Sequence, residues 1–282
     1  MTNKKDDLRR LGIYLLIVAS SSAMLFVFFK LINQSETAFA ILSEVFCAAP
    51  ALANLITRAV TKEGFRDMKL HLHLTGNLRY YLLAFLLPFV CTFMSYIPPI
   101  ILGGHSDWLG GFTLKNIVAA ILMLAAQGAV MSAGLVGEEL GWRGYMNRKM
   151  EPLVGVVGTV LIGGAVWSLW HLPSDMSLYL AGEETLSEAM KTVGGRLLFL
   201  PGYAAFYMWL TKKTDSVWPA VLSHGISNTS RTCIMELLRM GDIPENAEIN
   251  TGFFEFVPFI ITGVVFLWLM LRDKKKTEPL RK

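Results

Sequence analysis

The chain has 282 residues, of which 53% are hydrophobic and 17% are charged, and its formal net charge is +4. Soluble domains carry about 25% charged residues, so this composition argues against a water-soluble enzyme and favours a bilayer-embedded chain. The basic residues flank apolar runs instead of forming a water-facing surface, so we expect no nucleic-acid partner. The length fits a single integral membrane domain over residues 1–282.

Eight apolar runs are long enough to cross a bilayer, since a span needs roughly 20 mostly apolar residues. Backbone groups in lipid must be satisfied within the segment, so each run is expected to be a helix. The sequence therefore predicts an all-α, polytopic transmembrane bundle of about eight helices. The runs are 11–32, 37–60, 79–102, 114–137, 153–172, 194–211, 217–238 and 252–271.

Lys and Arg are concentrated in alternate connections. They occupy the N-terminus, the second, fourth and sixth connections, and the C-terminus. Because basic loops stay on the cytoplasmic side, this alternation predicts that both termini are cytoplasmic. We expect a multi-pass protein in the plasma membrane of a bacterial cell.

The fourth run ends in GEELGWRGY, which brings Glu138, Glu139 and Arg143 to the membrane boundary. Solvated charges at a helix end would explain a single such residue, but two adjacent acids on an uncharged helix are costly. Glu139 and Arg143 are four residues apart with the acid first, which is the better order for an ion pair. Glu138 is turned about 100° away. We therefore expect Arg143 to neutralise Glu139 and leave Glu138 as a general base or acid.

Two later runs carry histidines. The fifth ends in WSLWHLP, where Trp167 and His171 share a helix face, although an interfacial His at a helix C-terminus is an alternative explanation. The seventh contains SHGISN, where His224 and Asn228 share a face about one and a half to two turns inside the basic end. Such a pair is costly in mid-membrane unless it faces a polar cavity or a partner helix, so interhelical hydrogen bonding is the alternative to catalysis.

Together the three motifs supply a free Glu, two His and an Asn. This set provides a base, a second proton carrier or water-orienting group, and donors for a developing oxyanion. A metal bound by Glu138, His171 and His224 is the alternative. No Ser or Cys stands in a motif that marks a nucleophile, so water activation is favoured over an acyl-enzyme.

These motifs resemble those of a known family. EELGWR fits EExxxR, WSLWH fits FxxxH with Trp167 in place of Phe, and HGISN fits HxxxN. The pattern, over about residues 115–235, resembles the CAAX protease and bacteriocin-processing (CPBP, or Abi) intramembrane endopeptidases. The resemblance implies eight helices and a membrane-embedded catalytic core that opens to the cytosol. It implies that Glu138 and His171 activate a water, that His224 and Asn228 bind the oxyanion, and that Glu139 and Arg143 support them.

Glu138 lies near the end of one span and His171 near the end of the next, on opposite faces of a membrane if each span crosses it simply. The two residues can meet if 138–150 continues the first helix and the chain returns from residue 153 onward, which we predict.

We expect an intramembrane endopeptidase that cleaves a peptide or a membrane-associated protein tail, which is lipidated in one branch of the resembling family. No cofactor is required if Glu138 is the base, although a divalent metal such as zinc stays open. The expected partners are the lipid bilayer and the substrate. The alternatives are a non-catalytic binding or immunity protein of the same fold, and a transporter, for which paired broken helices are lacking.

Overall fold

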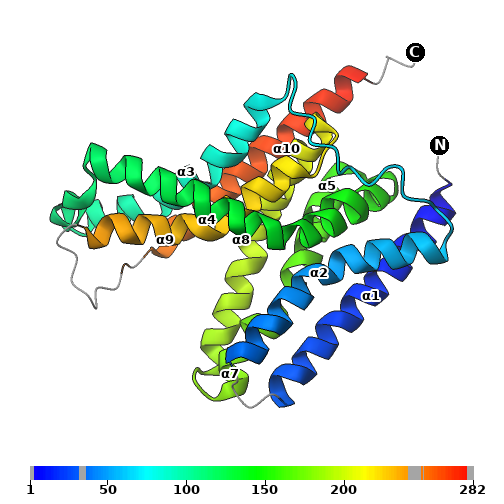
Figure 1. Ribbon diagram of the computed structural model, residues 1–282, viewed down its shortest axis with the longest axis horizontal. Coiled ribbons are helices and arrows are strands. Elements are labelled where there is room, and N and C mark those ends of the chain that lie inside the picture. Colours follow the sequence, from blue (N-terminus) through cyan, green and yellow to red (C-terminus); the bar gives the residue numbers. More distant parts are fainter. Residues whose placement is uncertain (1–2, 32–35, 241–248, 250, 278–282) are drawn as a thin grey trace.

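The computed structural model describes residues 3–31, 36–240, 249 and 251–277. These residues form helices and connections without a strand, and a long helix lies at each of the eight apolar runs, which confirms the predicted all-α bundle (Figure 1). The long helices are α1 (Lys4–Leu31), α2 (Glu36–Val60), α3 (Leu78–Leu102), α4 (Leu114–Gly141), α5 (Asn147–Trp170), α8 (Leu186–Thr214), α9 (Trp218–Arg239) and α10 (Val257–Thr277). The short ones are η1 (Ser106–Gly111), η2 (Trp142–Met146), α6 (Leu172–Asp175), α7 (Ser177–Ala181) and η3 (Gly252–Glu255).

The surface of the bundle is that of a membrane protein. On length and hydropathy alone, three helical segments of the described chain could cross a bilayer, namely Lys4–Phe28, Leu78–Leu102 and Leu114–Trp170. Large apolar side chains such as Leu86 and Ile261 are exposed along the helices. Extended exposed apolar surface of this kind marks contact with lipid. The protein is therefore a polytopic helical membrane protein.

One end of the bundle carries the start of α1 and the end of α10 (Figure 1). Ion pairs join the helices here: Lys149 lies 3.4 Å from Asp7, and Lys213 lies 2.6 Å from Asp273. We call it the terminal end. The start of α1 and the end of α10 thus lie at one end of the bundle, as an even number of spans requires, and their cytoplasmic placement stays a prediction.

A buried polar network closes the terminal end. Arg58, which is fully buried, donates from Nε to Asn54 at 2.7 Å and from Nη1 to Asp67 at 2.6 Å. Asn54 in turn donates to the carbonyl oxygen of Leu140 at 3.1 Å, which ties α2 to the last turn of α4. Burial by itself would raise the pKa of Asp67, but the hydrogen bond from Arg58 and the charge of Arg148 outweigh it and lower this pKa to about 2.

Glycines allow α4 to approach two neighbouring helices closely. A Cβ added to Gly141 would lie 2.3 Å from the Cβ of Pro50 in α2. On the other side of α4, a Cβ added to Gly225 of α9 would lie 2.2 Å from Oγ of Ser132 and 2.5 Å from the carbonyl oxygen of Gly128. Small residues of this kind let membrane helices pack backbone against backbone. The acidic motif at the end of α4 is thus held between α2 and α9.

The chain from α4 to α5 makes one long helical path that reverses at Gly155. α4 continues through the π-helical turn η2 into α5, and Gly155 interrupts the helix with a φ of 72°. This confirms the predicted continuation over 138–150 and the return after residue 153. Glu138 precedes Gly155 by 17 residues (155 − 138), and His171 follows it by 16 (171 − 155). At about 1.5 Å per residue, both lie at a similar distance from the turn.

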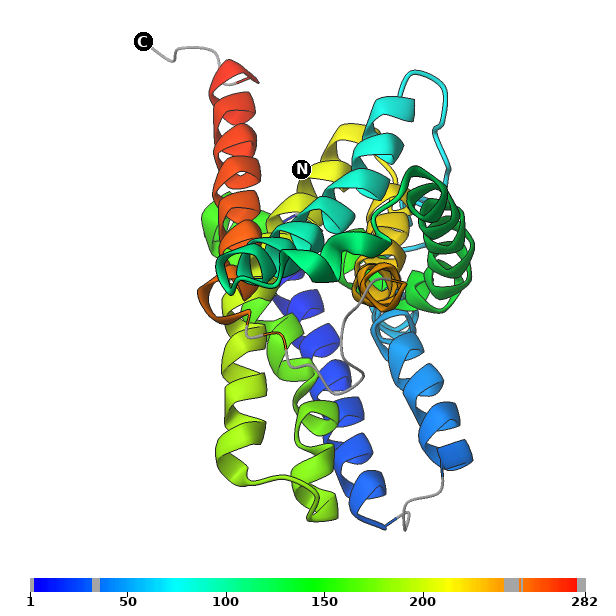
Figure 2. The ribbon, with the colours of Figure 1, turned by 90° about the vertical axis from the view of Figure 1, so that its left-hand side faces the viewer.

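The helices of the bundle diverge in two groups, which we call arms. In Figure 1, α4 and α9 run together to the left, whereas α1, α2 and the first half of α8 run downwards. Figure 2 shows α9 end-on while α1 and α2 run vertically, so the arms diverge in both views.

Candidate active site

Glu138 is held by two tryptophans. Glu138 is only 1% exposed. Its Oε2 accepts hydrogen bonds from Nε1 of Trp167 at 3.0 Å and from Nε1 of Trp142 at 3.4 Å. Oε1 accepts none from the residues that the structure describes, and Glu138 lines a cavity. The indole N–H is a donor only, so both tryptophans fix the carboxylate as an acceptor. One oxygen of the carboxylate is thereby anchored by two donors.

Glu139 is turned about 100° from Glu138 around the helix and is fully buried. Its Oε1 accepts from Nη1 of Arg143 at 3.0 Å and contacts Nδ1 of His224 at 2.9 Å. The Arg143 pair confirms the expected contact between positions i and i+4. The guanidinium of Arg143 also lies 4.1 Å from the ring centroid of Trp167 and 4.9 Å from that of Tyr207. Its charge is therefore met by one carboxylate and two aromatic faces.

The orientation of His224 follows from Glu139. Because a carboxylate is the partner at Nδ1, that nitrogen carries a proton, and Nε2 is the nitrogen free for another group. The ring packs edge-on against Trp167, with centroids 5.3 Å apart, and beside Tyr207 at 5.8 Å. Asn228, one turn further along α9, is exposed and makes no hydrogen bond within the described part of the chain. Both residues line the same cavity, as their shared helix face predicts.

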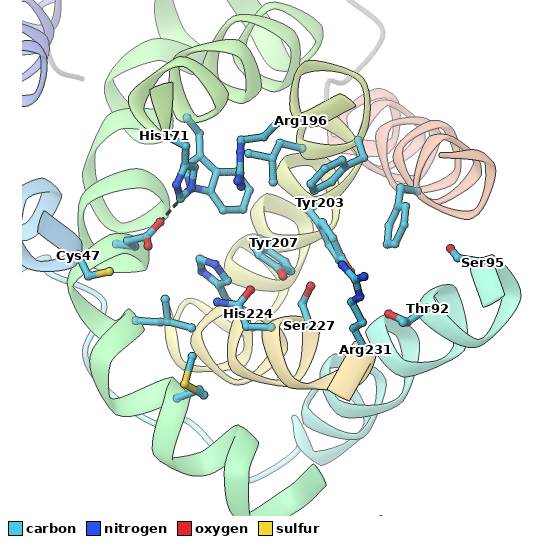
Figure 3. Close-up of a pocket in the computed structure, with 18 of the residues that line it drawn as sticks. Cys47, Thr92, Ser95, His171, Arg196, Tyr203, Tyr207, His224, Ser227 and Arg231 are labelled. Carbon is cyan, nitrogen blue, oxygen red and sulfur yellow. Dashed lines mark hydrogen bonds between the residues drawn. The ribbon is translucent and has the colours of Figure 1, made fainter. Parts of the chain in front are cut away.

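His171 follows the last residue of α5. Its ring meets Trp170 edge-on with centroids 4.8 Å apart, and it lies 6.4 Å from the ring of Trp167. Beside it in the cavity wall is Arg196 of α8 (Figure 3). Arg196 is held by Asp175 through two short hydrogen bonds, at 2.7 and 2.5 Å. Within this motif, the hydrogen bond to Glu138 comes from Trp167.

A cavity of about 730 Å³ joins the four candidate catalytic residues, which come from α4, α5 and α9. α8 supplies a further wall with Tyr203 and Tyr207 (Figure 3). From this site the cavity extends away from the terminal end, toward Arg231 and Glu255. The resemblance implies a site open to the cytosol, and the side of the membrane that this cavity faces stays a prediction.

Comparison with known proteins assigns the chain to a family. A family model described as type II CAAX prenyl endopeptidase, Rce1-like, matches residues 111–230, which include all three motifs. The protein CAAX prenyl protease 2 of Methanococcus maripaludis is 30% identical over 203 residues, covering 71% of this chain and 68% of that relative. The chain belongs to the CPBP family of CAAX proteases. Its family activity is therefore proteolysis by an integral membrane protein.

The motifs of this CPBP protein also allow a metal centre as an alternative. Such a centre requires three ligands close together. Among the described residues, no three His, Cys, Asp or Glu side chains are grouped closely enough to hold an ion. Oε2 of Glu138 receives two N–H donors, and Nδ1 of His224 is used by Glu139. Glu138, His171 and His224 as arranged do not fit a metal site, so we derive no step through one.

Several residues that line the cavity or contact Glu138 were not predicted from the sequence. Trp142 lies four residues after Glu138 within the same motif, and this spacing could have revealed its contact. Arg231 lies seven residues after His224, again on the same helix face. Tyr207 and Arg196 lie on α8, which contains none of the three motifs, so only the packing of α8 against α5 and α9 brings them to the site.

Proposed function

We propose that the protein is an intramembrane endopeptidase in which Glu138 activates a water molecule. The observation that supports this most is the anchored carboxylate of Glu138 in the wall of a cavity shared with His171, His224 and Asn228. In this reaction Glu138 takes a proton from water, and the oxygen attacks the peptide carbonyl. When the C–N bond breaks, the proton passes to the leaving amine, giving a carboxylic acid and an amine.

The remaining residues have complementary roles in this proposal. Asn228 offers an amide N–H, and His224 offers Nε2, to the oxyanion that forms when water attacks. For Nε2 to donate, the ring of His224 must carry both protons, and Glu139 supplies the compensating negative charge at Nδ1. His171, which lines the same cavity just after α5, is the second proton carrier. No cofactor takes part in this scheme.

The substrate class follows from the relative and from the cavity wall. The Methanococcus maripaludis relative is named a CAAX prenyl protease. Phe199, Leu200 and Phe259 give the cavity of the present chain an apolar side that suits a lipid chain. We therefore propose a membrane-associated peptide or protein tail, including lipidated tails, as the substrate. A bacterial plasma membrane stays a prediction.

The test uses the purified full-length protein in detergent, with a mixed peptide library and a prenylated CAAX peptide as separate substrates. Products are identified by mass spectrometry. Glu138→Gln should lower the rate by roughly 10²–10⁴-fold, the usual contribution of a general base. The matched control is Glu236→Gln, a half-buried acid on α9 that pairs with Arg239, and this variant should cleave like wild type.

Undiminished cleavage by Glu138→Gln would reject Glu138 as the base. If folded wild-type protein cleaves neither substrate, the proposal fails and a non-catalytic binding protein is the better explanation. Flux of a solute in proteoliposomes that is lost in Glu138→Gln would point to a transporter.

A further inference from the structure

A positively charged side chain lies at the far side of the cavity from Glu138. Arg231 follows His224 by seven residues and Asn228 by three on α9, so the three share one helix face. Figure 3 shows Arg231 reaching from α9 into the space between Thr92 of α3 and Tyr203 of α8. It is an exposed residue that lines the same cavity. The charge therefore faces the space that a substrate would occupy.

No acid neutralises Arg231 within the described part of the chain. Its guanidinium lies 5.9 Å from the ring centroid of Tyr96, and it forms no ion pair there. The other arginine of the cavity, Arg196, is already taken up by Asp175. Glu255 also lines the cavity near Tyr96 but does not approach Arg231 within ion-pair distance. A guanidinium held this way among helices is a site for an anionic group of a ligand.

We propose that Arg231 binds the free C-terminal carboxylate of the substrate and thereby selects the bond that is cut. Seven residues of helix separate Arg231 from His224 by about 10.5 Å. An extended peptide spans about 3.3 Å per residue, so this distance holds about three residues. A chain end bound at Arg231 would place the bond about three residues upstream beside His224 and Glu138. Arg231 is a specificity-determining residue, and its proposed role rests on the proposed peptidase function.

A peptide carboxylate fits this place better than a lipid phosphate. The planar guanidinium matches a carboxylate through two parallel hydrogen bonds. Arg231 and His224 also lie in line along α9, so an extended peptide can reach both residues at once. A lipid headgroup would need only Arg231.

The first test measures binding without cleavage. In the Glu138→Gln background, the affinity of a fluorescent prenylated CAAX peptide is compared between its free-acid and C-terminal amide forms. The free acid should bind roughly ten- to a hundredfold more tightly, as for a lost hydrogen bond to a charged group. Arg231→Gln should reduce this ratio to about onefold by removing that bond, and Arg231→Lys should restore part of it. Arg239→Gln, an exposed arginine two turns away, should keep the ratio of the parent.

An equal affinity for acid and amide in the parent, or an acid preference that survives Arg231→Gln, overturns the proposal. If Arg231 bound any anion, vesicles of anionic lipid would compete with the free-acid peptide as well as a second free-acid peptide does. This outcome also rejects the proposal. The binding assay needs no turnover, so acid-selective binding without cleavage by wild type would count against the peptidase function while supporting the carboxylate site.

The second test reads the cut position in wild type. Peptides lengthened by one residue at the C-terminus should be cut one residue further along, because the register is counted from the carboxylate. A cut that stays at a fixed distance from the lipidated cysteine shows that the lipid sets the register and refutes the role of Arg231.

Discussion

Trp167 stands where the resembling family motif has Phe, and its indole N–H makes the shorter of the two hydrogen bonds to Glu138, at 3.0 Å. Trp167→Phe removes this donor and keeps an aromatic ring beneath the guanidinium of Arg143, which lies 4.1 Å from the ring centroid. The substitution therefore separates the hydrogen bond from the ring. If the anchored oxygen matters for activating water, the variant should fold normally and turn over more slowly.

The magnitude follows from the two contacts on Oε2. A hydrogen bond to a charged group contributes about 1.5–3 kcal/mol. Trp142 remains as a donor at 3.4 Å, so we expect a loss near the lower limit, about 1.5 kcal/mol, or roughly tenfold in kcat/KM. Trp142→Phe removes the longer contact and should cost less, about two- to threefold.

The assay is cleavage of one peptide by wild type and both variants, with thermal unfolding in detergent measured alongside. A folded Trp167→Phe protein as active as wild type would refute the reasoning, since the ring alone would then suffice. A larger loss from Trp142→Phe than from Trp167→Phe would show that the donor–acceptor distances of 3.4 and 3.0 Å do not rank the two donors.

Three further predictions concern the scaffold. Gly225→Ala should lower the free energy of unfolding by about 1–3 kcal/mol and reduce activity, because the added Cβ would meet the backbone of α4. Gly194→Ala is the control: its added Cβ meets open space, so the variant should be neutral or slightly stabilised in the same thermal melts. Asp67→Asn should lower stability by about 1 kcal/mol at neutral pH, allowing for a carboxylate that is 43% exposed. Since folding lowers this pKa from 3.8 to about 2, the contribution is present above pH 4 and is lost toward pH 2, so the melting temperatures should converge in acid. Cysteines placed at Lys5 and Arg239 should react with an impermeant reagent from opposite sides of the membrane, and labelling from one side would contradict the arrangement.

Much of the fold was readable because bilayer physics leaves few choices. A run of about 20 apolar residues can satisfy its backbone in lipid only as a helix, so the eight helices follow from hydropathy. Contacts within one helix were readable too: the spacing of Glu139 and Arg143 predicts their ion pair, which is present at 3.0 Å. The shared faces of Trp167 with His171, and of His224 with Asn228, follow from the same periodicity.

Contacts between helices were not readable in this way. Hydropathy does not say that α2 and α9 hold the end of α4 between them, since this depends on glycines whose neighbours lie far away in the sequence. The basic residues of the connections look solvated in the sequence, but Arg58 is fully buried in a polar network. The cavity likewise depends on helix packing, since its lining includes residues of α3, α4, α5, α8 and α9.

The sequence by itself determined the helices, the three polar motifs and the face on which each motif lies, because these depend on local periodicity and on the cost of charge in lipid. Only the tertiary structure decided which motif residues meet. The turn at Gly155 brings Trp167 to Glu138, and close packing of α4 on α9 brings His224 to Glu139. These contacts depend on distances between helices, which are set by side-chain volumes at the crossings and not by the spacing within any one helix.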